Sequence, residues 1–261
     1  MTAPDPMPED PYIDAPIPPP DEADDPETGG KKKDSPSIAK LLVEMAEEQY
    51  RLIRSTDDRA YVVAKDGPGL AIPLGSKHGL KLRLAASLRR RTGLVPGGSA
   101  LTDCITILEG EAADLPRQDV HLRVARHRHS IVVDLGTATG HVAVITPDGW
   151  SVQADSPVVF RRSSLSNPFP DPQPGGALDD LRALLNLTDT DFRLAIGWVI
   201  AGYFPDIPHP LLFVQGEHGT GKTDLVRALL ALIDPPVAAE RSIPPGEREW
   251  AIFARASWAF A

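Results

Sequence analysis

A glycine-rich stretch late in the sequence constrains the fold of this chain more than any other feature. Residues 216–223 read Gly-Glu-His-Gly-Thr-Gly-Lys-Thr, which fits the spacing Gly-x-x-x-x-Gly-Lys-Ser/Thr. Glycines let the backbone bend so that several amide N–H groups point inward at an anion. A helix that starts at the end of such a loop adds the partial positive charge of its N-terminus. The spacing therefore predicts a phosphate-binding loop, or P-loop.

The residue types within this loop indicate a nucleoside triphosphate such as ATP as the ligand. We expect Lys222 to reach the β- and γ-phosphates and the Thr223 hydroxyl to complete the coordination of Mg²⁺. We interpret His218 as a spacer whose backbone N–H is used, rather than as a catalytic base, and no catalytic residue is identified. The predicted nucleotide-binding residues are Gly216, Glu217, His218, Gly219, Thr220, Gly221, Lys222 and Thr223.

The segments on either side of the loop fit a strand and a helix. The continuous apolar run at 211–214 predicts a buried parallel strand. Apolar residues recur at helical spacing from Leu225 to Ile233, and the following Asp234-Pro235-Pro236 predicts the end of that helix. Strand, loop and helix thus occur in the order that a P-loop requires.

Hydrolysis needs a further carboxylate at the end of a neighbouring strand, which holds magnesium and orients water. None of the acids that follow the loop ends a clear apolar strand: Asp224, Asp234, Glu240, Glu247 and Glu249. Residues 258–261 fit the start of such a strand, and only 38 residues follow Thr223. A complete P-loop sheet takes roughly 100 residues more. We therefore expect a fragment or early-terminated form of a longer ATPase, and the sequence leaves hydrolysis open.

The rest of the chain divides by composition and periodicity. Residues 1–30 hold nine of the 36 acids, nine of the 27 prolines and no Lys or Arg, so this segment is expected to be disordered. Helical and strand-like patterns follow: helices at 38–53 and 78–91, a hairpin around 66–69, a β-meander over 120–152 and helices at 177–186 and 189–203. We predict an acidic, Pro-rich tail (1–37), an α+β accessory domain (38–160), a linker and helix (161–188) and an incomplete α/β P-loop NTPase domain (189–261).

A second stretch, 131–140, has two interpretations. Its Asp134-Leu135-Gly136-Thr137 resembles the first phosphate loop of actin- and Hsp70-type ATPases, in which an acidic residue and a Gly-Thr turn join two strands. That fold needs two lobes of about 150 residues each, and only some 120 residues follow here. We favour the second interpretation, a β-hairpin turn with a polar tip.

Basic residues gather in two places and indicate a nucleic-acid surface. Residues 67–102 contain six bases and no acid, and 117–129 contain seven Arg or His residues against Asp119. Bases on one side of a small domain would neutralise phosphates and release counterions, although cations also favour helix C-termini. The candidate nucleic-acid contacts are Lys81, Arg83, Arg89, Arg90, Arg91, Arg123, Arg126 and Arg128. A metal site at His121, His127 and His129 is not favoured, because no cysteine or carboxylate sits at ligand spacing.

The composition argues against secretion and membrane insertion. No apolar run approaches the roughly 20 residues of a membrane span, and the N-terminus lacks a basic-then-apolar signal segment. The single cysteine, Cys104, excludes an internal disulfide. We therefore expect a cytoplasmic protein without a membrane partner.

The order of these features resembles ATP-binding proteins of phages and mobile elements, which are related to primase-helicases of the AAA-like superfamily-three type. The similar stretches are 132–136, 146–150, 175–178, 211–223, 234–235 and 254–258. The resemblance implies an ATPase of DNA replication with ATP and Mg²⁺ as cofactors, DNA as a partner, and a homo-oligomer at full length. The chain departs from that family by stopping before the strand with the magnesium-binding acid (Walker B), often Asp-Asn, and before the sensor and arginine-finger segments.

Two other functions stay open at this point. The first is a non-enzymatic nucleic-acid-binding module with a vestigial nucleotide site. The second is a P-loop kinase of small molecules, which the basic N-terminal domain and the late position of the loop disfavour.

Overall fold

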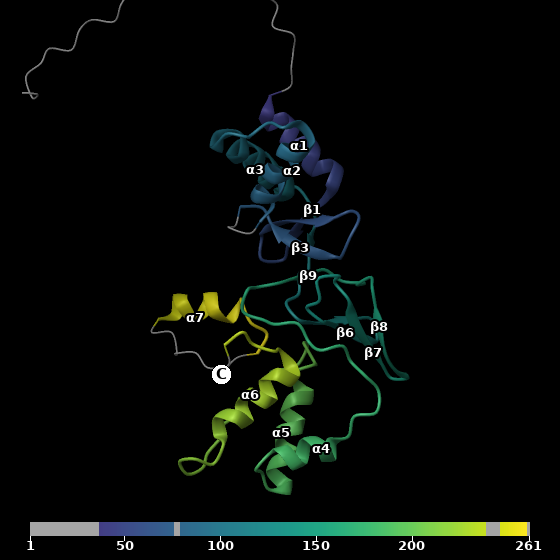
Figure 1. Ribbon diagram of the computed structural model, residues 1–261, viewed down its shortest axis with the longest axis vertical. Helices are drawn as coiled ribbons and strands as arrows, with labels where there is room; N and C mark the ends of the chain where they lie inside the picture. Colours follow the sequence, from purple (N-terminus) through teal and green to yellow (C-terminus); the bar gives the residue numbers. More distant parts are fainter. Residues whose placement is uncertain (1–36, 76–78, 239–245, 260–261) are drawn as a thin grey trace, which may run out of the picture. The chain divides into compact units, whose positions relative to one another are not determined.

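The computed structural model describes residues 37–75, 79–238 and 246–259, which form a mixed α/β protein with two sheets (Figure 1). The tail predicted at 1–37 lies outside the described residues except for its last residue. Among the residues that are described, no helix is both long and apolar enough to cross a membrane.

The first sheet has five strands in the order β4-β1-β2-β3-β9. Its central pairs β1–β2 and β2–β3 are antiparallel, and its outer pairs β1–β4 and β3–β9 are parallel. The strands are β1 (Tyr50–Ser55), β2 (Ala60–Ala64), β3 (Leu70–Pro73), β4 (Arg117–Gln118) and β9 (Phe160–Arg161). The hairpin predicted around 66–69 is confirmed as the β2–β3 connection.

The first helix, α1 (Ile38–Gln49), is shorter than the sequence predicted. It starts where the Ser37 hydroxyl accepts a hydrogen bond from the Lys40 amide at 3.2 Å, which is an N-cap. The prediction that it continues to residue 53 was wrong, because Tyr50 begins β1. Leu52 and Ile53 point to opposite faces of the sheet and pair with Val62 and Tyr61 of β2, so cross-strand burial outweighs helical spacing.

Two further helices cover one face of this sheet. In α2 (Leu80–Thr92) the buried residues are Leu80, Leu84 and Leu88, and Gly93 ends the helix with a left-handed φ of 76°, as predicted. The next helix, α3 (Gly98–Ala113), was not predicted. The three helices and the inner face of the sheet share one apolar core, which includes Cys104.

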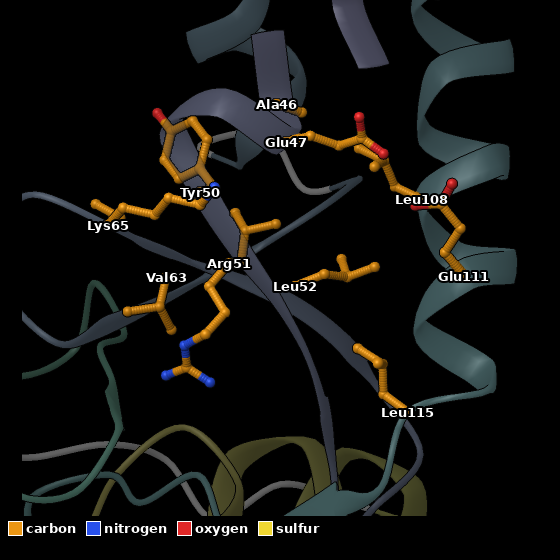
Figure 2. A pocket seen from close by; sticks show the side chains of 12 residues that line it. Ala46, Glu47, Tyr50, Arg51, Leu52, Val63, Lys65, Leu108, Glu111 and Leu115 are labelled. Atoms are coloured by element: carbon orange, nitrogen blue, oxygen red, sulfur yellow. The ribbon is translucent and has the colours of Figure 1, made fainter. Parts of the chain in front are cut away.

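A pocket of about 810 Å³ lies beside β1, against β2 and α3 (Figure 2). In the described chain, β4 pairs with β1 only at Arg54 and Ser55, so the earlier residues of β1 have no strand on that side. Apolar side chains of β1, β2 and α3 line the pocket together with four charged residues, Glu47, Arg51, Lys65 and Glu111.

The second sheet is the predicted β-meander. Its strands are β5 (Val124–His127), β6 (Ser130–Asp134), β7 (Val142–Thr146) and β8 (Gly149–Gln153), paired antiparallel in that order. The stretch 131–140 therefore belongs to the β6–β7 hairpin and its connection, which confirms the hairpin interpretation. Residues 120–123 were predicted as strand but precede β5, which starts at Val124.

Four helices follow the sheets: α4 (Leu178–Leu184), α5 (Asp189–Ala201), α6 (Lys222–Ile233) and α7 (Glu247–Ala254). The first three were predicted, and α6 ends at the predicted Asp234. Buried residues of α5 and α6 pack on Leu185 in one core. The strand expected at 258–261 is absent at Trp258 and Ala259, and its last two residues lie outside the described chain.

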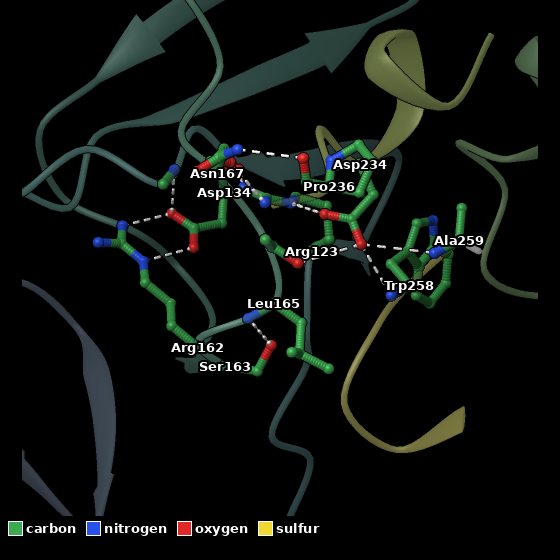
Figure 3. Close-up of polar contacts among 12 residues, drawn as sticks. Arg123, Asp134, Arg162, Ser163, Leu165, Asn167, Asp234, Pro236, Trp258 and Ala259 are labelled. Carbon is green, nitrogen blue, oxygen red and sulfur yellow. Dashed lines mark hydrogen bonds and ion pairs between the residues drawn. The ribbon is translucent and has the colours of Figure 1, made fainter. Parts of the chain in front are cut away.

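A buried ion pair joins the meander to the end of α6 (Figure 3). Arg123 Nε lies 2.8 Å from Asp234 Oδ1, and both side chains are at least 95% buried. The other Arg123 nitrogens donate to the carbonyl oxygens of Asp134 at 3.0 Å and Asn167 at 2.9 Å. The second Asp234 oxygen accepts from the Trp258 amide at 2.9 Å. The charges are thus paired and their hydrogen-bonding capacity is used, as burial of charge requires.

A second pair lies beside the first. Arg162 donates to both oxygens of the buried Asp134 carboxylate, at 2.6 and 2.8 Å, and to the Thr137 carbonyl. Asp134 also accepts from the Gly136 amide at 3.0 Å, which closes the turn after β6. The polar tip of the hairpin is therefore held by an arginine 28 residues away.

We predict that Asp234→Ala lowers the free energy of unfolding by about 3–5 kcal/mol, because it leaves Arg123 buried and unpaired. Urea denaturation followed by circular dichroism measures this loss. Asp224→Ala is the matched control, since Asp224 is exposed on the same helix and its removal should leave the transition midpoint unchanged. A wild-type midpoint for Asp234→Ala would contradict the structural role of the pair.

We also predict that Cys104 is unreactive in the native protein. Burial raises the pKa of its thiol to about 11, with a smaller contribution from Glu111, so about one thiol in a thousand is ionised at pH 8. Because the thiol ionises less readily in the folded protein, it contributes to the free energy of unfolding. This contribution is complete below about pH 9 and is lost as the pH rises toward 11. A colourimetric thiol reagent at pH 8 should react promptly only after denaturation, and rapid reaction of the native protein would contradict this prediction.

Candidate nucleotide-binding loop

The loop at 216–223 is compact and ends at the first residue of a helix. Residues 218–219 form a turn, and α6 starts at Lys222. Gly219 has a φ of 81° and Gly221 a φ of 78°, both in the left-handed region that favours glycine. The sequence spacing therefore reflects a backbone requirement of this turn.

The Lys222 side chain turns back over the loop that precedes it. Its ammonium nitrogen donates to the carbonyl oxygens of Gly216 at 3.0 Å and Glu217 at 2.6 Å. The Thr220 hydroxyl donates to the same Glu217 carbonyl at 2.9 Å, and a side chain at position 216 would lie within 2.9 Å of that hydroxyl. The loop is thus wrapped closely around one positive charge at the N-terminus of α6.

A pocket of about 570 Å³ adjoins the loop. One wall consists of loop and α6 residues, including Gly216, Thr220 and Lys222. The other consists of α4 and the turn after it, with Leu181, Leu185, Asn186 and Leu187 among the lining residues. Thr223 is exposed in the first turn of α6. The site therefore combines a cation, backbone amides at a helix start and an apolar wall.

The strand predicted before the loop is absent. Residues 211–214 are outside any strand, and Leu211 and Phe213 are 100% and 80% exposed. A strand needs a neighbour for its backbone N–H and C=O groups, and none of the described segments pairs with this run. The Trp198 indole N–H donates to the Pro210 carbonyl at 2.8 Å and fixes the start of the segment instead.

The acids that the sequence offered for magnesium do not gather at the loop. Among the described residues that line the pocket, Asp224 is the one carboxylate, and it faces Arg227 at 3.1 Å on the same helix. Asp234 is buried against Arg123, and Glu247 and Glu249 lie in the first turn of α7. Glu240 lies outside the described residues. Of the described acids that follow the loop, Asp224 is therefore the one that lies beside the pocket.

The basic residues of α2 are mostly exposed. Arg83, Arg89 and Arg90 point to solvent, while Arg91 pairs with Glu48 of α1 at 2.6 Å. Lys81 is half-buried, and its ammonium donates to the Thr102 hydroxyl at 3.3 Å. Lys77 lies outside the described residues.

The second basic group is divided by the fold. Arg123 is buried in the ion pair with Asp234, so its side chain is not available to a nucleic acid. Arg126 pairs with Asp206 and lies over the ring of Phe204. Arg128 is exposed in the β5–β6 turn, with a φ of 55°. These three arginines therefore do not form one surface.

No group of three or more His, Cys, Asp or Glu side chains suited to a metal ion occurs in the described part of the chain. His121 instead contacts the ring of Phe160, with ring centroids 6.1 Å apart. Burial lowers the pKa of His121, and Asp119 opposes this shift.

The polar cluster of Arg123, Asp134, Arg162 and Asp234 is the feature that the sequence interpretation missed. Arg123 and Asp234 are 111 residues apart, and no local spacing connects them. The sequence predicts Asp234 as the end of a helix and offers it among the acids for magnesium, and it predicts Arg123 as a nucleic-acid contact. A weak signal existed at Asp134, which directly follows the apolar residues 131–133, and at Arg123, which lies between Leu122 and Val124.

The pocket beside β1 is a weaker candidate. It carries two acids, Glu47 and Glu111, and two bases, Arg51 and Lys65 (Figure 2). Because acids and bases are equal in number, the pocket favours neither an anionic nor a cationic ligand.

Comparisons with known proteins found no match for this chain among family descriptions, curated proteins or solved structures.

Proposed function

We propose that this chain binds ATP with Mg²⁺ through the loop at 216–223. The observation that carries the proposal is the Lys222 ammonium, held by two carbonyl oxygens of the glycine loop at the start of α6. The two carbonyls that hold it are weak partners for a full charge, so phosphate oxygens would replace them favourably. The helix start adds its partial positive charge at the same point.

The remaining parts of the ligand follow from the surroundings of the loop. The Thr223 hydroxyl lies one residue after Lys222 and would contribute to the magnesium coordination. The apolar wall of Leu181, Leu185 and Leu187 would cover the base, and Asn186 supplies hydrogen-bonding groups beside it. In this proposal, residues 189–261 belong to an α/β P-loop domain and residues 38–160 form an accessory domain.

We extend the proposal to an ATPase of DNA-replication or helicase type, on the resemblance described above. The exposed arginines of α2 support a contact with DNA, since within the described part of the chain only Arg91 among them forms an ion pair, with Glu48. Assembly into a homo-oligomer is an expectation from that resemblance, and hydrolysis stays open because the chain departs from the family before the magnesium-binding acid. The alternative is a non-enzymatic nucleic-acid-binding module with a vestigial nucleotide site, and what supports it is that Asp224 is the one carboxylate among the described residues that line the pocket.

We predict that Lys222→Ala weakens the binding of Mg-ATP by at least about tenfold, because the charge paired with the phosphates is lost. Isothermal titration of both proteins measures the difference. Lys65→Ala is the control, since it removes an exposed lysine far along the chain from the loop. Equal affinity of wild type and Lys222→Ala would refute the nucleotide site.

For the nucleic-acid surface, we predict salt-dependent binding of single-stranded DNA that is lost when Arg89, Arg90 and Arg91 are changed to Ala. Fluorescence anisotropy over a series of salt concentrations measures the affinity for DNA and how steeply that affinity falls with salt. The control Arg193→Ala removes an exposed arginine of α5 and should leave both unchanged. Affinity that does not vary with salt would exclude this surface while leaving the nucleotide site untouched.

A further inference from the structure

The strand β8 is the outer strand of the meander, and its free edge is unprotected. The sheet order is β5-β6-β7-β8, and no described segment pairs with the outer side of β8. All five of its residues, Gly149 to Gln153, are exposed. Natural edge strands usually carry a charge, a proline or a bulge that blocks pairing, and β8 contains no charged residue and no proline.

The hairpin register decides which backbone groups point outward. A two-residue turn, Pro147-Asp148, joins β7 to β8, and Thr146 faces Gly149. A turn of this length makes Thr146 and Gly149 a hydrogen-bonded pair, so bonding to β7 alternates from there along β8. The N–H and C=O groups of Trp150 and Val152 therefore point to the free edge.

The side chains of the same residues form an apolar patch. Trp150 lies opposite Ile145, and Val152 lies opposite Ala143 on the same face of the sheet. Ile145, Trp150 and Val152 are 36%, 47% and 43% exposed. A free edge and an apolar surface thus coincide on β8.

We propose that a second copy of this chain binds here, by antiparallel pairing of β8 with β8 about a twofold axis at Ser151. In this register Trp150 faces the partner's Val152, and Val152 faces the partner's Trp150. The outward backbone groups of both residues then form four hydrogen bonds between the copies. Each aromatic ring packs beside a β-branched side chain, which is a favourable cross-strand pair.

The charges around β8 fit this occupant. The register places Asp148 opposite the partner's Ala154, and Asp155 opposite the partner's Pro147, so no two acids face each other. Ser151 alone lies opposite its own copy. The pairing is isologous and closes after two copies, because it uses the single free edge of β8 in each.

Disulfide trapping tests the register. In the proposed dimer the two Ser151 Cα atoms lie about 4.5 Å apart, as in a non-hydrogen-bonded pair, which suits a disulfide. We expect Ser151→Cys to form a covalent dimer under mild oxidation. Gln153→Cys is the matched control, since its two copies would lie about 13 Å apart and should not link. The wild type has only the buried Cys104 and should stay monomeric on a denaturing gel.

Charge at the axis tests the association without a cross-link. Ser151→Asp places two like charges opposite each other and should leave a monomer, whereas Ser151→Thr should preserve the dimer. Light scattering after size-exclusion chromatography, over a range of concentrations, gives the masses. A wild type that is monomeric at every concentration would overturn the proposal. Equal trapping by Ser151→Cys and Gln153→Cys would overturn it as well, because it would indicate random collision or another partner strand.

Discussion

The buried ion pair between Arg123 and Asp234 is the contact on which the C-terminal half of the structure depends. Arg123 lies just before β5 and Asp234 at the end of α6, so the pair fastens the helix that starts in the glycine loop to the meander. Removing two charges from water is costly, and this geometry offsets the cost with hydrogen bonds to both side chains. The segment that follows β9 joins the same junction, since the backbone amide of Asn167 donates to the Pro235 carbonyl at 2.6 Å.

The ion pair at the end of α6 explains why the glycine loop keeps its form although no described strand lies beside it. One end of α6 is held by Asp234, and the C-terminal half of the helix packs on α5 through Leu229 and Ile233. The loop at the other end needs only its glycines and the Lys222 contacts to close. Residues 211–214 pair with no described strand, so Leu211 and Phe213 remain exposed, whereas Leu212 is half-buried against the core of α5 and α6.

The two basic segments show how differently the fold treats similar composition. In α2 the helix places three leucines inward, and the arginines at its other positions are exposed. In the meander, one arginine turns inward to an acid, another pairs with Asp206, and a third extends from a turn. Burial and pairing, rather than the number of bases, determine which of these residues can meet a phosphate backbone.

Local patterns in the sequence by themselves determined α2, the β2–β3 hairpin, the meander with its β6–β7 turn, and α6 with its glycine turn. Each of these depends on residues within one or two turns or strands, such as the Leu80, Leu84 and Leu88 spacing. Only the tertiary structure decided that Tyr50 starts a strand, that 211–214 stays unpaired, and that Arg123 is buried. The reason is physical. A strand needs a neighbouring strand for its backbone hydrogen bonds, and a buried charge needs a counter-charge beside it. Those partners lie far along the chain, where no local pattern identifies them.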